Sequence, residues 1–252
     1  MELLRVLERA IEERRDLQYG NLFYSEELGI NVDKYNDIAV VQWWNRQLEK
    51  LAKEIFDLLH SYFPHVIEKN DLKKRVKAGL KRRKRIVRGY KHRTIIQEGK
   101  FKFFVDCLHG QRTGFYLDQV ENHLRVEELL EYSERTLDLF SYTGPFGIHA
   151  SIYSSKVICV DKSLYAVKEG YNNVRLNKLP HVDFVHQDAL DYLYNVYKQE
   201  KFDLAIVDPP EYIKLEYLAS VLRLACKLSK TVVFINRLRL RVKQREGLIV
   251  WY

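Results

Sequence analysis

Hydrophobic and polar positions follow a helical repeat in two parts of the first third of the chain. Apolar residues recur at helical spacing over 2–16 and again over 45–63, which predicts two amphipathic helices. The polar stretch "DKYND" (33–37) predicts a turn. Short apolar runs predict strands at "NLFYSEE" (21–27), "IAVVQWW" (38–44) and "HVIEK" (65–69). These elements together predict a small α+β unit.

The pattern changes after residue 93. "TIIQEGKFKFFVDCL" (94–108) contains two strand-like runs about the turn "EGK", which predicts an antiparallel hairpin. From residue 136 onward, short apolar runs alternate with helical patterns. Strands are expected at 136–140, 156–161, 182–188, 202–208 and 231–236, and helices near 146–154, 163–177, 189–200 and 214–228. Strands that alternate with helices predict a parallel sheet with helices on both faces.

Charge separates these two parts. The chain of 252 residues has a formal net charge of +8, and residues 73–93 contain twelve Lys or Arg and no Asp or Glu. We interpret this run as a basic linker that ends a first domain (1–92) before a second domain (93–252). A run this long and one-sided repels itself, which favours contact with nucleic acid over a merely solvated segment. The expected RNA contacts are Lys81, Arg82, Arg83, Lys84, Arg85 and Arg88.

Composition excludes several classes of protein. No run of about 18 apolar residues is present, so no membrane span is expected. The charged N-terminal segment lacks a secretory signal. The three cysteines lie far apart in the sequence without metal-ligand spacing, so neither a metal site nor a disulfide is expected. These features predict a cytoplasmic protein with free thiols.

Four successive predicted strands each deliver an acidic residue at or near their carboxyl end. These residues, separated by 23, 27 and 20 positions, are Asp138, Asp161, Asp188 and Asp208. One such residue is readily explained as a helix N-cap. Four in order favour a ligand site, because ligands of open parallel sheets bind where the strands end.

The residue types at this edge restrict the classes of ligand that can bind there. The first loop, "FSYTGPFG" (140–147), carries Gly144 and Gly147, which allow a close approach of the backbone to a ligand. It lacks the GxGxxG pattern, and Pro145 removes an N–H donor, which disfavours a phosphate cradle. Asp161 suits the two hydroxyls of a ribose, and Asp188 suits the amine of adenine. Ribose and adenine without a pyrophosphate favour S-adenosylmethionine over NAD.

Four segments resemble motifs I to IV of class I S-adenosylmethionine-dependent methyltransferases: "LDLFSYTGPFGIHAS", "VICVDKS", "VDFVHQDALDYL" and "FDLAIVDPPEYIK". Two more, "FFVDCLHGQRTGFYLDQVENHLRV" and "INVDKYNDIAVVQ", are similar to signatures of the ribosomal RNA large subunit methyltransferase I-like group, which are 5-methylcytosine RNA methyltransferases. The resemblance implies a Rossmann-like class I methyltransferase domain preceded by a small α+β domain. The PUA domain usual in that group is expected to be missing.

The resemblance also implies roles for matching residues. S-adenosylmethionine would be held by Gln119, Asp138, Tyr142, Thr143, Gly144, Gly147, Asp161, Lys162, Asp188 and Ala189. The target base would face Asp208, Pro209 and Pro210. The alternative for Gln119, Asp161 and Asp188 is simple capping of the next helix.

The sequence departs from this group at the nucleophile. The group's catalytic cysteine follows the fifth strand, whereas this chain has "SKTVVFINRLRL" there and no cysteine after Cys226. Three interpretations remain open. The chain is an RNA methyltransferase acting on an atom that needs no covalent intermediate, or it forms 5-methylcytosine with Cys226, Cys107 or a nucleophile that the sequence does not identify. Alternatively, it is a catalytically degenerate RNA-binding protein. We favour the first, with ribosomal RNA preferred over transfer RNA as substrate.

Overall fold

The structure, a computed structural model, describes residues 2–128, 133–197, 199–236 and 247–251. The chain divides into two compact units: Met1–Glu98 with Phe104–Asp118, and Gly99–Phe103 with Gln119–Tyr252. By their contacts, residues 93–98 and 104–118 group with the first unit, whereas the domain boundary was predicted after residue 92. The division into domains 1–92 and 93–252 stays a prediction.

The first unit contains a five-stranded sheet with the order β1-β2-β3-β4-β5, in which only β3 and β4 run parallel. Its strands are β1 (Tyr19–Ser25), β2 (Ile30–Tyr35), β3 (Ile38–Trp43), β4 (His65–Asn70) and β5 (Arg83–Arg88). Its helices are α1 (Glu2–Arg14), the 3₁₀ turn η1 (Arg46–Glu49), α2 (Ala52–Tyr62) and α3 (Lys73–Lys77). Leu7 of α1 and Leu59 of α2 are buried in one core with the strands, which confirms an amphipathic helix in each predicted stretch. The second stretch, predicted as one helix over 45–63, is divided into η1 and α2.

Two predictions for the first unit are corrected by the structure. The turn predicted at 33–37 is present only at Asn36 and Asp37. The preceding residues 33–35 lie in β2, where Asp33 is buried with hydrogen bonds from Asn21, Asn31 and Thr113 at 2.7–2.9 Å. The basic run is not a linker: it forms α3 and β5, the edge strand of the sheet. Distant polar partners stabilise both segments.

The predicted hairpin is present as β6 (Arg93–Glu98) and β7 (Phe101–Asp106), which form a two-stranded sheet. Its chain then continues through the 3₁₀ turn η2 (Leu117–Gln119) into α4 (Val120–Glu128).

The second unit contains a six-stranded sheet in which every adjacent pair of strands runs parallel. The strand order is β10-β9-β8-β11-β12-β13. The strands are β8 (Ser133–Leu139), β9 (Ser154–Asp161), β10 (Val182–His186), β11 (Phe202–Val207), β12 (Ser229–Ile235) and β13 (Leu248–Trp251). The five strands predicted for this part are confirmed, and β13 was not predicted.

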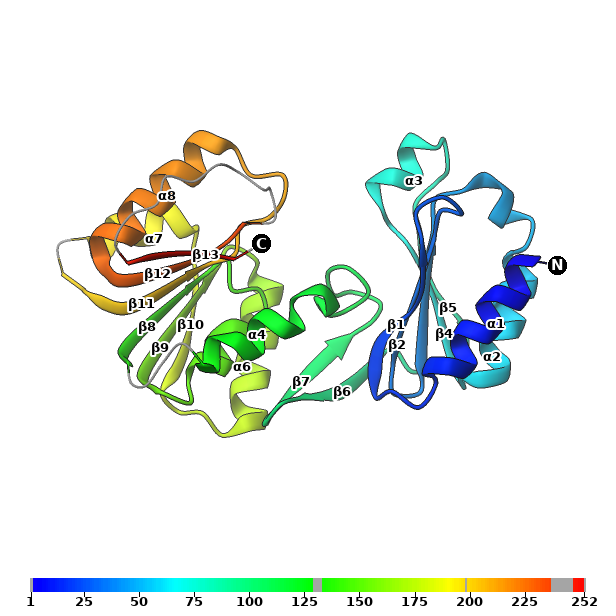
Figure 1. Cartoon of the computed structure of the whole chain (residues 1–252), viewed down its shortest axis with the longest axis horizontal. Coiled ribbons are helices and arrows are strands. Elements are labelled where there is room, and N and C mark those ends of the chain that lie inside the picture. Colours follow the sequence, from blue (N-terminus) through cyan, green and yellow to red (C-terminus); the bar gives the residue numbers. More distant parts are fainter. Residues whose placement is uncertain (1, 129–132, 198, 237–246, 252) are drawn as a thin grey trace. The chain divides into compact units, whose positions relative to one another are not determined.

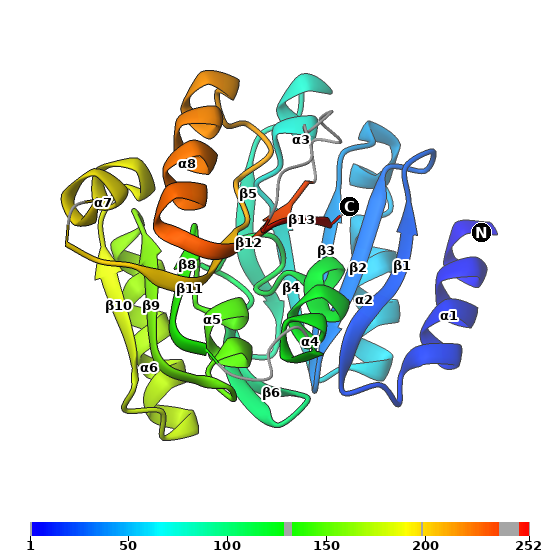
Figure 2. The ribbon, with the colours of Figure 1, turned by 60° about the vertical axis from the view of Figure 1, so that its left-hand side comes forward.

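Helices cover both faces of this sheet, as Figures 1 and 2 show. One face packs against α7 (Ala189–Val196) and α8 (Leu215–Leu228). The other packs against α4, α5 (Pro145–Ala150) and α6 (Leu164–Asn177). Neighbouring residues of β9 alternate between the two cores, since Ile158 belongs to the first and Cys159 to the second. This is the doubly covered parallel sheet that the sequence predicted.

Candidate functional site at the carboxyl edge of the parallel sheet

The acidic residues converge where the strands end. Leu139, the last residue of β8, pairs with Val160 of β9 and with Val207 of β11. Asp161 follows Val160, and Asp208 follows Val207, so these two carboxylates leave the sheet at the same edge. Asp188 comes two residues after the end of β10. The register therefore brings three of the predicted site residues to one edge.

Asp138 lies one residue inside β8 and is fully buried. Its Oδ2 accepts the N–H of Gly147 at 2.9 Å, while Oδ1 has no hydrogen-bond partner among the described residues. Burial raises the pKa of Asp138 well above its ordinary value, and the nearby negative charges of Asp208 and Asp161 raise it further. Asp138 therefore favours the protonated form, and its Oδ1 is left to form a hydrogen bond with a ligand.

The loop after β8 is held in a strained conformation. Phe140 (φ 63°) and Tyr142 (φ 50°) both adopt the left-handed region, which costs a residue other than glycine about 1–3 kcal/mol. Hydrogen bonds from neighbouring segments help to hold this loop: the N–H of Tyr142 donates to Asp161 Oδ2 at 2.9 Å, the N–H of Ser141 donates to the carbonyl of Val160 at 3.1 Å, and the carbonyl of Thr143 accepts Asn173 Nδ2 at 3.0 Å. Strain of this kind is typical of functional sites, and contact of this backbone with the cofactor stays a prediction.

The two glycines of this loop have a packing role that the sequence did not indicate. Gly144 has φ 84°, and a Cβ atom there would lie 2.4 Å from the ring of Phe184. A Cβ atom at Gly147 would lie 2.4 Å from Cys159 Sγ. Both positions therefore require glycine for internal packing, and their contact with a ligand stays a prediction.

Asp188 is the N-cap of α7, which is the alternative role considered for it. Its Oδ1 accepts the N–H groups of Leu190 (2.9 Å) and Asp191 (3.4 Å), and the hydroxyl of Tyr217 (2.5 Å). All three bonds end on Oδ1, and none within the described part of the chain ends on Oδ2. Tyr217 lies 29 residues away on α8, so nothing in the local sequence indicated this contact.

Asp161 accepts one backbone hydrogen bond on each carboxylate oxygen, whereas the N-cap of α6 is Ser163. Its Oδ1 accepts the N–H of Ser163 at 2.8 Å, and its Oδ2 accepts that of Tyr142. Burial raises the pKa of this carboxyl, although both N–H groups oppose the shift. Each oxygen keeps a second lone pair for a hydroxyl donor.

The other predicted site residues lie on the adjoining segments. Lys162 follows Asp161, and its carbonyl is within hydrogen-bond distance of His186 Nε2 (3.0 Å). Ala189 is the buried first residue of α7. Gln119 is buried at the end of η2, and its side-chain oxygen accepts Asn122 Nδ2 at 3.0 Å.

After β11 the chain turns through the two prolines. The N–H of Asp208 donates to the carbonyl of Leu139 at 3.4 Å, which links the start of this turn to the end of β8. The carbonyl of Pro210 accepts the N–H of Ile213 at 3.0 Å, so this carbonyl is used within the turn. Pro209 is buried between Asp208 and Pro210. Asp208 and the carbonyl of Pro209 remain the acceptors expected to face a base.

Two of the three cysteines are unsuited to act as nucleophiles. Cys107 and Cys159 are fully buried, and burial raises the pKa of each thiol well above its ordinary value. Cys226 lies on α8, where it packs against the hydrophobic core. The segment "SKTVVFINRLRL" (229–240), where the group's catalytic cysteine is expected, is described as far as Asn236, and residues 237–240 lie outside the described residues.

The six basic residues expected to contact RNA differ in their surroundings. Arg83 and Arg85 donate to the buried carboxylate of Glu68 at 2.6 and 2.7 Å, and Arg88 donates to Asp57 at 2.5 Å. Lys84 lies at the limit of an ion pair with Asp71, at 4.0 Å. Lys81 and Arg82 are exposed and form no ion pair within the described residues.

Comparisons with known proteins agree with this architecture. The family model for S-adenosylmethionine-dependent methyltransferases matches residues 88–233. A Methanocaldococcus jannaschii protein carrying the name of a ribosomal RNA large subunit methyltransferase is 40% identical over 188 residues, 73% of this chain and 49% of that protein. Ribosomal RNA large subunit methyltransferase I of Aeromonas salmonicida is 33% identical over 232 residues, 89% of this chain and 57% of that protein. The chain thus spans about half the length of the curated relatives it matches.

A solved structure shares the fold. A structure from Streptococcus mutans described as a SAM-dependent methyltransferase has a TM-score of 0.77 and 19% identity, covering 91% of this chain and 64% of that one. At this identity the likeness concerns the fold alone.

Proposed function

The chain belongs to the S-adenosylmethionine-dependent methyltransferase family, and from this premise we propose that it transfers a methyl group to a base of RNA, with ribosomal RNA as the substrate class. One observation carries the proposal: the register of the parallel sheet aligns Asp161 and Asp208 at one edge, beside a strained loop. The names of the relatives at 33–40% identity favour ribosomal RNA over transfer RNA.

The residues at the sheet edge fit the family's cofactor. Asp188 Oδ2 is available for the adenine amine, and Asp161 keeps lone pairs for the ribose hydroxyls. Asp138 Oδ1, a buried polar atom with no partner among the described residues, is available to the amino-acid end together with the backbone of Tyr142 to Gly147. S-adenosylmethionine, when bound, supplies an electrophilic methyl group.

The surroundings of the cysteines favour an acceptor atom that attacks the methyl group directly. A carbon acceptor in cytosine needs a thiolate, which burial disfavours at Cys107 and Cys159, while Cys226 of α8 packs against the core. An exocyclic amine attacks through its own lone pair. Asp208 and the carbonyl of Pro209 then accept the amine hydrogens and orient the lone pair.

Labelled methyl transfer to unmodified ribosomal and transfer RNA, followed by nucleoside mass spectrometry, tests the proposal. We expect a methylated amine in ribosomal RNA. A 5-methylcytosine product that is lost in Cys226→Ala or Cys107→Ala would contradict the assignment of an exocyclic amine as the methyl acceptor. Cofactor binding in calorimetry without transfer to either RNA would support the catalytically degenerate alternative.

Tyr217→Phe is expected to weaken cofactor binding by about 3- to 10-fold, because one hydrogen bond that orients Asp188 is lost. Calorimetry with S-adenosylhomocysteine measures this change. Tyr194→Phe is the matched control, since Tyr194 is 60% exposed on the neighbouring helix α7. Equal affinities of Tyr217→Phe and wild type would exclude Asp188 from the adenine site.

The RNA contact is expected to centre on Lys81 and Arg82, because the other predicted cations are paired within the unit or lie close to an acid. Lys81→Glu/Arg82→Glu should weaken RNA binding and lower the slope of log affinity against log salt by about 2, at about 0.9 per phosphate contact. Lys50→Glu/Lys53→Glu changes the net charge equally on exposed residues beside or within α2. A slope reduced equally by both variants would contradict a specific contact at Lys81 and Arg82.

We further propose that the protein acts in the cytoplasm. Its three cysteines are free, which suits a reducing compartment. The described part of the chain contains no helix with the length and apolarity needed to span a membrane.

A further inference from the structure

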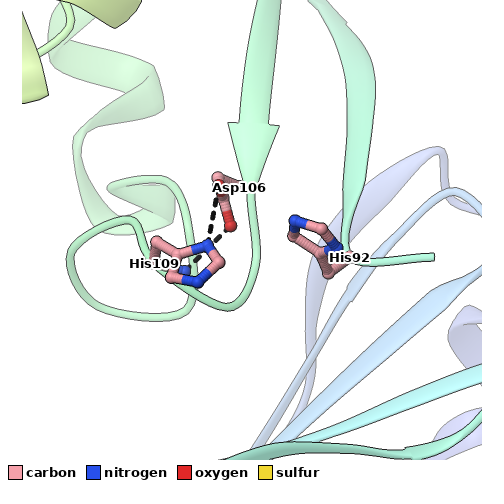
Figure 3. A group of neighbouring side chains, drawn as sticks. All are labelled: His92, Asp106 and His109. Carbon is pink, nitrogen blue, oxygen red and sulfur yellow. Dashed lines mark hydrogen bonds and ion pairs between the residues drawn. The ribbon is translucent and has the colours of Figure 1, made fainter. Parts of the chain in front are cut away.

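Three side chains from separate segments of the first unit meet beside the β6–β7 hairpin. His92 precedes β6, Asp106 ends β7, and His109 lies in the turn that follows (Figure 3). One potential ligand atom from each residue lies within 4.8 Å of the other two. The imidazole rings of His92 and His109 are 5.4 Å apart and nearly perpendicular.

The carboxylate of Asp106 is oriented before any ligand binds. Its Oδ1 accepts the N–H groups of Leu108 and His109 at 3.0 and 2.8 Å. Its Oδ2 faces His109 Nδ1 at 3.2 Å. Two ligand atoms about 2.0–2.1 Å from a tetrahedral ion lie about 3.3 Å apart, so this pair already has the required spacing.

A backbone hydrogen bond holds His92 close to Asp106. The N–H of Cys107 donates to the carbonyl of His92 at 2.8 Å, so the segments that carry His92 and Asp106 cannot separate without breaking this bond. His92 is half-buried, and one of its ring nitrogens already lies within 4.8 Å of the potential ligand atoms of Asp106 and His109. A fixed carboxylate with two adjustable imidazoles is a donor set typical of zinc and similar ions.

We propose that His92, Asp106 and His109 bind a divalent transition-metal ion of the zinc class, with water completing the coordination. The ion fastens the base of the β6–β7 hairpin to the following turn, a structural role distinct from the sheet edge of the second unit. The sequence did not indicate this site, because the ligands are 14 and 3 positions apart and match no spacing typical of metal sites. A hydrogen-bonded cluster without an ion, with Arg93 3.9 Å from Asp106 Oδ2, is the competing description.

Calorimetric titration of untagged protein with zinc chloride tests the site. We expect one stoichiometric site whose affinity falls at least about tenfold in His92→Ala and in His109→Ala, because even loss of an indirect support costs a metal site about 10–100-fold. Arg93→Gln keeps all three ligands and removes a repelling charge, so its affinity should be kept or rise. His60→Ala, an exposed histidine of α2, is the matched control.

Hydrogen exchange supplies a second readout. Zinc should slow exchange of the amides of residues 107–112 in wild type but not in the His92→Ala/His109→Ala variant. Absence of binding at submillimolar zinc, or a site retained in that double variant, would overturn the proposal. Cobalt should produce visible absorption bands in wild type that the double variant lacks.

Discussion

Replacement of Asp208 by alanine is expected to lower methyl transfer to RNA by about 10²- to 10⁴-fold, the range typical of a lost proton acceptor. The affinity for S-adenosylmethionine should stay near that of wild type, because the ribose and adenine are assigned to Asp161 and Asp188. The backbone hydrogen bond from residue 208 to Leu139 does not depend on the side chain, so the turn after β11 is retained. Single-turnover transfer and calorimetry separate these two effects.

Asp203→Ala is the matched control, because Asp203 lies at the opposite end of the same strand. Its Oδ2 accepts the N–H groups of Glu134 and Arg135 at 2.8 and 3.0 Å, and its Oδ1 pairs with Lys230. The control should lower stability with little effect on the rate of transfer per folded molecule. Equal losses of transfer and cofactor affinity in Asp208→Ala would assign Asp208 to the cofactor site.

The parallel sheet was predictable because its strands are buried on both faces. Runs such as "VICVD" of β9 and "LAIVD" of β11 are almost continuously apolar, and each is followed by a helical repeat. The same property predicted which edge carries the site, since Asp161 and Asp208 end their strands. Local sequence contains all of this information.

β2 and β5 could not be predicted because their polar residues are satisfied by partners far away in the sequence. Asp33 of β2 is hydrogen-bonded by Thr113, 80 residues later. Arg83 and Arg85 of β5 pair with Glu68 of the neighbouring strand β4. Without those partners a charged stretch is typical of a turn or a linker. Charges on an edge strand also discourage pairing with a second sheet.

The candidate site was predictable in its residues and only partly in its chemistry. The acids follow from strand ends, but the left-handed backbone of Phe140 and Tyr142 has no signal in the sequence, because neither is a glycine. Tyr217 and Asn173 reach the site from helices that only the tertiary fold brings close. In the basic run the sequence overestimated the number of cations available to RNA. Several of these cations form ion pairs within the first unit, which the sequence did not indicate.

Gly144→Ala is expected to destabilise the second unit by roughly 2–5 kcal/mol, the sum of a left-handed backbone forced on alanine and an overpacked contact. The added Cβ would meet the ring of Phe184, which already packs closely against α6, since a Cβ at Gly170 would lie 2.2 Å from the same ring. The ring therefore cannot move away toward α6. Denaturant unfolding followed by hydrogen exchange in β8–β10 measures the loss.

A Phe184→Ala background separates the two contributions. Removal of the ring relieves the contact, so Gly144→Ala should there cost only about 1–2 kcal/mol, the backbone share. The loss of unfolding free energy caused by Gly144→Ala should be the same with and without S-adenosylhomocysteine, after the stabilisation by ligand binding is subtracted. The reason is that the glycine is required by internal packing. Unchanged stability of Gly144→Ala combined with a large loss of cofactor affinity would contradict this, and would mean that residue 144 lacks a side chain because the cofactor lies against it.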